Sequence, residues 1–187
     1  MKRLFIGISF STELKDYFKH AQLMVEKYCE VAKYTSYDNF HLTLKFLGMM
    51  EEASVNQLIE IINSIDVEKI ILMLDHIGFF KKKNRYVIYM GTHPNEALTK
   101  VAMDLHDALV EARLVTQEEF IYTPHVTLCR NAKLLVPSVD LSRGIDIQKE
   151  MMLDNITLYE STNINGVLTY QPVSYTHLRA HETLRHL

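Results

Sequence analysis

The sequence contains one four-residue pattern twice, and this repetition constrains both the fold and the direction of its polar side chains. The two copies are His41-Leu42-Thr43-Leu44 and His125-Val126-Thr127-Leu128. In a β-strand, residues two apart point to the same face. Each copy, as a strand, therefore places a histidine and a threonine on one face and two aliphatic side chains on the other. The aliphatic pair is expected to pack on a core, and the polar pair to face away from it.

Hydrophobic periodicity predicts a long amphipathic helix before each copy of the pattern. Ser11 or Thr12 can cap the first helix, whose apolar positions recur every three or four residues as far as Tyr28. Further helices are expected over 53–65 and over 95–113, after Pro94. Strands are expected over 3–10, 41–47, 69–77, 85–90, 125–130, 151–161 and 167–173, with a hairpin connection at 81–84. This order suggests two similar halves that face each other.

Composition excludes several classes of protein. The 187 residues are about one domain's worth, and 48% of them are hydrophobic, so a sizeable core needs no disulfide or metal. The two cysteines form no disulfide framework, and the cytoplasm is therefore the expected compartment. The apolar run near the N-terminus reads as a buried strand, and no run reaches the ~20 residues of a membrane span. The net charge of −3 argues against coating of duplex nucleic acid.

The paired histidines suit acid–base chemistry on a phosphodiester. Histidine titrates near neutral pH, so His41 and His125 can serve as one proton donor and one proton acceptor. Thr43 and Thr127 can donate hydrogen bonds to phosphate oxygens, and this chemistry requires neither a metal nor a cofactor. Zinc binding is the rival use of two histidines. Cys129 is a formal third ligand, because strand alternation would place it on the face of His125.

Longer segments around the two copies resemble a known family. The segments are His41–Gly48, with the sequence HLTLKFLG, and Phe120–Arg130, with the sequence FIYTPHVTLCR. They resemble the signature motifs of the 2H phosphoesterase superfamily, in particular its LigT-like RNA 2′,3′-cyclic phosphodiesterase branch, also called 2′-5′ RNA ligases. The resemblance extends over residues 1–173 and includes an opening strand, a central hairpin and a closing segment from Tyr159 to Tyr170.

The resemblance implies a bilobal α+β fold with two antiparallel sheets lining a central cleft and helices packed outside. It implies hydrolysis of the 2′,3′-cyclic phosphate at RNA 3′ ends, tRNA fragments among them, to a 2′-phosphomonoester. His41 would donate a proton to the departing 3′ oxygen and His125 would activate water, although the sequence leaves the order of these roles open. Thr43 and Thr127 would hold the phosphate. Arg130 would contact phosphate or ribose.

Other residues have competing interpretations. Alternation places Lys45 on the face of His41, where it would meet RNA phosphate or lie in solvent. The basic cluster of Lys81, Lys82, Lys83 and Arg85 is most simply a solvated hairpin turn. Phe46 and Tyr122 are candidates for stacking on a base, with core packing favoured for Phe46.

The last residues, 174–187, match nothing in the family pattern. We expect one bilobal domain over 1–173, followed by a non-native or disordered tail, and a monomer. Alternative functions are a 2H enzyme that acts on another cyclic nucleotide or a 2′-5′ linkage, a non-catalytic RNA-end-binding module, and a metal-dependent hydrolase.

Overall fold

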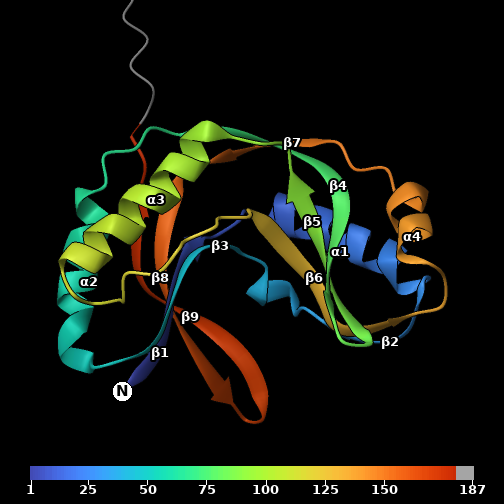
Figure 1. Ribbon diagram of the computed structural model, residues 1–187, viewed down its shortest axis with the longest axis horizontal. Helices are drawn as coiled ribbons and strands as arrows, with labels where there is room; N and C mark the ends of the chain where they lie inside the picture. Colours follow the sequence, from blue (N-terminus) through green and yellow to red (C-terminus); the bar gives the residue numbers. More distant parts are fainter. Residues whose placement is uncertain (180–187) are drawn as a thin grey trace, which may run out of the picture.

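The computed structural model describes residues 1–179 of the chain (Figure 1). Helices are interspersed among the strands, and two short 3₁₀ turns lie at Tyr37–Asn39 and Glu52–Ser54. The strands are β1 Lys2–Ile8, β2 Cys29–Tyr34, β3 Leu42–Met50, β4 Ile70–Lys82, β5 Arg85–Thr92, β6 His125–Leu134, β7 Lys149–Leu153, β8 Asn155–Ile164 and β9 Val167–His177. The helices are α1 Thr12–Glu26, α2 Val55–Ser64, α3 Glu96–Glu111 and α4 Ser138–Gly144.

The named strands pair antiparallel in the order β7-β4-β5-β6-β3-β1-β8-β9. Off this path, β2 pairs antiparallel with the later residues of β6, from Cys129 to Leu134. One half contains β3, β1, β8 and β9, and the other contains β7, β4, β5, β6 and β2. The halves meet at a single residue pair, Leu42 of β3 with Val126 of β6. The α+β, two-lobed prediction is confirmed, and the two expected sheets are continuous through this pair.

The helices cover the sheet in a crossed manner. α1 follows β1 in the chain but packs against β6 of the other half, whereas α3 follows β5 but packs against β3 of the other half. Figure 1 shows α2 and α3 along one half and α1 and α4 along the other. The Ser11 side chain caps α1 by accepting from the Leu14 amide, and Asn95 caps α3 by accepting from the Leu98 amide. Among the helices of residues 1–179, none is long and apolar enough to cross a bilayer.

Several expected elements differ from those observed. The strand expected at 151–161 is two strands, β7 and β8. They are separate because β7 pairs with β4 in one half, whereas β8 pairs with β1 in the other half. β2 and α4 were not expected at all. β3 continues beyond Gly48 to Met50, with Gly48 in the left-handed conformation at φ 76°. This conformation costs glycine little, so the strand turns there without ending.

The boundary expected at residue 173 falls inside a strand. β9 continues to His177 and pairs with β8 along residues 174–177, and the Leu178 side chain is buried. Strand pairing with β8 extends this far because β8 itself begins at Asn155, opposite His177. Residues 180–187 lie outside the described residues. The non-native origin of the tail stays a prediction.

Candidate active site

The two copies of the pattern meet where the two halves join. His41 directly precedes β3, His125 begins β6, and the next residues of each copy, Leu42 and Val126, form the joining pair. The aliphatic residues of both copies are fully buried, as strand alternation predicted; they are Leu42, Leu44, Val126 and Leu128. Because the pairing is antiparallel, each histidine lies toward the threonine of the other copy. The structure therefore brings His41, Thr43, His125 and Thr127 to one junction.

His41 is held in a single orientation. Its Nδ1 donates to the Asn39 carbonyl at 2.7 Å, since a carbonyl can only accept, and its Nε2 lies 3.0 Å from the Thr43 hydroxyl. The rings of Phe5, Tyr159 and Tyr170 pack around the imidazole, with centroid distances of 4.8, 6.2 and 5.0 Å. Burial in this aromatic surrounding lowers the pKa of His41 to about 4. At neutral pH the free protein therefore presents an unprotonated Nε2.

His125 repeats this arrangement in the other half. Its Nδ1 donates to the Thr123 carbonyl at 2.8 Å, again two residues before the histidine. Phe80 and Tyr89 pack on its ring at centroid distances of 5.2 and 5.1 Å. Burial lowers the pKa of His125 as well, and the nearby positive charge of Arg130 lowers the pKa values of both histidines. Both imidazoles thus have their Nδ1 occupied and their Nε2 available for chemistry.

A β-bulge follows the threonine in both copies. Gly7 and Ile6 of β1 pair with Thr43 and Lys45, so Leu44 is an extra residue in β3. Likewise, Tyr89 and Ile88 of β5 pair with Thr127 and Cys129, which makes Leu128 an extra residue in β6. An extra residue reverses the side-chain alternation beyond it. The residue five positions after each histidine, rather than four, therefore returns to the histidine face.

The bulges correct two expectations based on alternation. Lys45 pairs with Ile6, on the core side of β1, and its ammonium lies 4.3 Å from the centroid of the Phe120 ring instead of beside His41. Cys129 is buried in the hydrophobic core, so it does not share the face of His125 as the third ligand of a zinc site would.

Phe46 and Arg130 occupy the positions that the bulges return to the site. Phe46 pairs with Phe5, and its ring is 60% exposed, so the core packing favoured for it is wrong. Arg130 is exposed and lines a pocket together with Asn39 and Tyr170, which flank His41. The half of His41 thus contributes an aromatic ring at this position, and the half of His125 contributes a cation.

Neighbouring segments fix the backbone of both copies. In the second copy, the Thr127 carbonyl accepts from the Thr35 hydroxyl, and the Leu128 carbonyl accepts from the side chain of Gln22, which is 1% exposed. In the first copy, the Thr43 carbonyl accepts from the Tyr122 hydroxyl at 3.2 Å. Tyr122 is therefore engaged in holding β3.

Sequence reasoning missed Asn39 and His76. The Asn39 side chain donates to the Leu168 carbonyl and accepts from the Tyr170 amide, which ties the residue that orients His41 to β9. His76 and His125 both pair with Gly91, from opposite sides, and the His76 ring lies where a side chain at Gly91 would be. Asn39 and Thr123 lie at the same position, two residues before their histidines, and this shared spacing is the only sequence signal for the role of Asn39. Nothing in the sequence pattern indicated His76.

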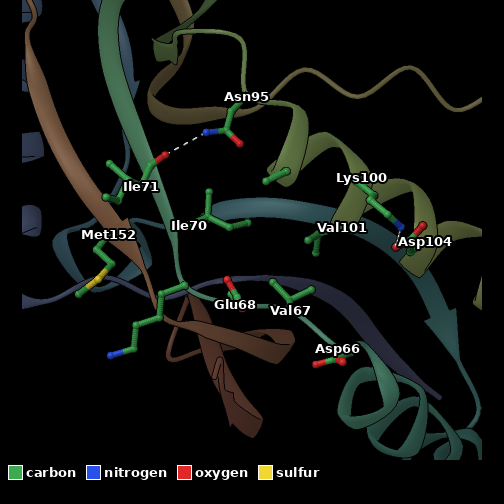
Figure 2. Close-up of a pocket in the computed structure, with 12 residues that line it drawn as sticks. Asp66, Val67, Glu68, Ile70, Ile71, Asn95, Lys100, Val101, Asp104 and Met152 are labelled. Atoms are coloured by element: carbon green, nitrogen blue, oxygen red, sulfur yellow. Dashed lines mark hydrogen bonds and ion pairs between the residues drawn. The ribbon is translucent and has the colours of Figure 1, made fainter. Parts of the chain in front are cut away.

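A sizeable cavity lies away from this junction. It has a volume of about 650 Å³ and lies between the start of β4 and α3, lined by Ile70, Ile71, Val101 and Met152 with charged residues around them (Figure 2). Asn95 bridges its wall by donating to the Ile71 carbonyl. None of its lining residues belongs to either copy of the pattern. The chemistry of the histidine pair is therefore separate from this cavity.

Comparison with known proteins assigns the family. Residues 5–160 match the family model of the AKAP7 2′5′ RNA ligase-like domain. The chain belongs to the 2H phosphoesterases, in their LigT-like branch. The predicted family is confirmed by this match.

Individual relatives cover most of the chain. An RNA 2′,3′-cyclic phosphodiesterase of Methanocaldococcus jannaschii is 26% identical over 166 residues, covering 86% of this chain and 91% of the relative. One of Thermotoga maritima is 28% identical over 167 residues, covering 86% and 87%. The crystal structure of Escherichia coli LigT complexed with 3′-AMP superposes with a TM-score of 0.76 at 25% identity, covering 95% of this chain and 97% of that one.

Proposed function

We propose that this 2H phosphoesterase hydrolyses the 2′,3′-cyclic phosphate at the 3′ end of RNA to a 2′-phosphomonoester. The observation that carries the proposal is the convergence of two histidines at the β3–β6 junction, each with Nδ1 bonded to a carbonyl, which leaves Nε2 as the nitrogen that can exchange a proton. The names of the relatives support the substrate class.

The reaction needs one proton removed and one delivered. The oxygen of a water molecule bonds to phosphorus while the bond from phosphorus to O3′ breaks. One histidine takes a proton from the water and the other gives a proton to O3′, which leaves a 2′-phosphate and a 3′-hydroxyl. Each such group typically contributes about 10²–10⁴ in rate. Thr43, Thr127 and Arg130 are proposed to bind the phosphate oxygens as negative charge develops on them.

The donor histidine must acquire its proton in the complex. The family resemblance gives the donor role to His41, yet burial and Arg130 hold the pKa of both histidines below the ordinary value in the free protein. A bound phosphate places negative charge beside the imidazoles, and negative charge raises the pKa of a histidine. We therefore propose that substrate binding itself charges the donor.

Phe46 is proposed to receive the terminal base. Its exposed ring lies beside Phe5, which packs on His41, so a base stacked on Phe46 would lie next to the reacting phosphate. Stacking on an aromatic side chain accepts any base and is worth about 1–3 kcal/mol.

The test is an assay with a chelator present. An RNA oligomer ending in a 2′,3′-cyclic phosphate is incubated with the protein, and the product isomer is identified by chromatography against 2′- and 3′-phosphate standards. The proposal predicts the 2′-phosphate. A 3′-phosphate would mean that O2′ leaves instead. Binding of the oligomer without turnover would indicate an RNA-end-binding module, and loss of activity with the chelator would indicate a metal-dependent hydrolase.

A further inference from the structure

Two cations face each other beside the site. Lys33 of β2 pairs directly with Arg130 of β6, and both side chains are exposed. Like charges directly opposite each other on neighbouring strands are destabilising. Within residues 1–179 neither cation has an ion-pair partner. Lys133, in the same strand pair, is instead neutralised by Glu30 at 2.7 Å.

Lys33 and Arg130 line one pocket of about 220 Å³ between β2, β6 and the turn that joins β8 to β9. Its other polar wall includes Ser36 and Asn39, and no acidic residue lines it. Such a cavity is suited to an anion, because every charge at its surface is positive and hydroxyl and amide groups complete the lining. A bound anion would offset the repulsion between the two cations.

The pocket adjoins the catalytic histidines. Asn39, in its wall, accepts the hydrogen bond that orients His41, and Tyr170, also in its wall, packs edge-on against the His41 ring. Arg130 is close enough to both histidines for its charge to lower their pKa values. An anion in this pocket would therefore lie next to the cyclic phosphate without occupying its place.

We propose that Lys33, together with Arg130, binds the phosphodiester that joins the terminal nucleotide to the preceding one. The inference rests on the proposed function, and it makes short RNA oligomers better substrates than cyclic mononucleotides. Two cations suit one or two backbone phosphates, and the net charge of −3 argues against the many phosphate contacts that duplex binding typically uses. Lys33 is the residue expected to distinguish oligomers from mononucleotides, since Arg130 can contact either the cyclic phosphate or the preceding phosphodiester.

The test compares three substrates and three proteins. The substrates are a 2′,3′-cyclic mononucleotide, the same compound with a 5′-phosphate, and a dinucleotide ending in the cyclic phosphate. The proteins are wild type, Lys33→Gln and the matched control Lys133→Gln, whose lysine already has a carboxylate partner. Measurements are kcat/KM at two salt concentrations and the dissociation constant of the dinucleotide 2′-phosphate product.

Wild type is expected to prefer the dinucleotide over the unphosphorylated mononucleotide by about tenfold in kcat/KM, which is the value of one hydrogen bond to a charged group. The mononucleotide with a 5′-phosphate should recover most of this gain. Lys33→Gln should remove the preference and weaken product binding about tenfold, while kcat/KM for the unphosphorylated mononucleotide stays within about twofold. The preference should shrink as salt rises. Lys133→Gln should behave as wild type.

Equal kcat/KM for all three substrates, or a loss in Lys33→Gln that is the same for each, would overturn the subsite. A gain that requires the second nucleoside and is absent with the 5′-phosphate would also overturn it. If no substrate is hydrolysed, the proposed function fails, and product binding by wild type and Lys33→Gln still decides the subsite on its own. Matching unfolding temperatures verify that both variants fold.

Discussion

The halves around His41 and His125 share a plan and differ in its details. Each orients its histidine through a carbonyl two residues earlier, and each has a bulge directly after the threonine. His41 is only 8% exposed, with three aromatic rings around it, whereas His125 is more open. In the proposed reaction, the shared plan supplies two proton-transfer groups. Under the proposed function, the differences would make one half a place for an aromatic base and the other a place for phosphate.

The strongest test of the shared plan removes one histidine at a time. His41→Gln and His125→Gln should each lower kcat at least about 100-fold, because each removes one proton-transfer group. His20→Gln, on the exposed surface of α1, is the control and should leave kcat unchanged. A near-normal rate in either site variant would show that the halves do not act as a pair.

The difference in burial predicts an acid-sensitive fold. His41 stays neutral in the folded protein down to about pH 4, whereas the unfolded chain takes up this proton near the ordinary pKa of about 6.5. The unfolded state therefore binds more protons in this interval, and the free energy of unfolding should fall by about 3 kcal/mol as pH drops through it. The lowered pKa of His125 adds in the same direction.

Denaturant unfolding of wild type and His41→Gln between pH 7 and 4 measures this effect. The variant should lose less stability than wild type as the pH falls, because glutamine does not titrate. Identical losses in the two proteins would contradict the burial argument.

The residues that supply the two carbonyls offer a matched pair of substitutions. The Asn39 side chain, 5% exposed, has two hydrogen bonds to β9, whereas the Thr123 side chain makes none within residues 1–179. Asn39→Ala should cost about 1–3 kcal/mol of unfolding free energy by leaving backbone groups of β9 unpaired. Thr123→Ala should cost little. Equal effects on stability and kcat would mean that β9 does not position His41.

The smallest expected effect concerns Arg130. Replacing it with Gln removes a positive charge near both imidazoles, so the pKa values of His41 and His125 should both rise. Titration of the two histidines by NMR measures the change. A rise at only one of them would show that Arg130 belongs to one half alone.

Strand alternation predicted the parts of the site that depend on local pattern. It placed His41 and Thr43 opposite Leu42 and Leu44, and it did the same for the second copy. It failed beyond Leu44 and Leu128, because a bulge is set by pairing with a neighbouring strand and the pattern of one strand does not record it. Lys45 and Cys129 were therefore placed on the wrong face.

Elements with weak hydrophobic patterns were also missed. β2, with the sequence CEVAKY, has no fully buried side chain and is defined by its pairing to β6. Lys33 and the pocket beside Arg130 follow from that pairing. The role of Asn39 depends on β9, which lies about 130 residues later in the chain. These long-range contacts are the part of the site that one sequence does not reveal.

The pH dependence of kcat/KM tests the central claim most directly. It should be measured with a chelator on a dinucleotide 2′,3′-cyclic phosphate for wild type, His41→Gln and His125→Gln. The two-histidine account predicts a bell-shaped profile for wild type, loss of the acidic limb in the variant that lacks the base, and loss of the alkaline limb in the variant that lacks the acid. A wild-type profile that is flat between pH 5 and 8, or variants that keep both limbs, would contradict it.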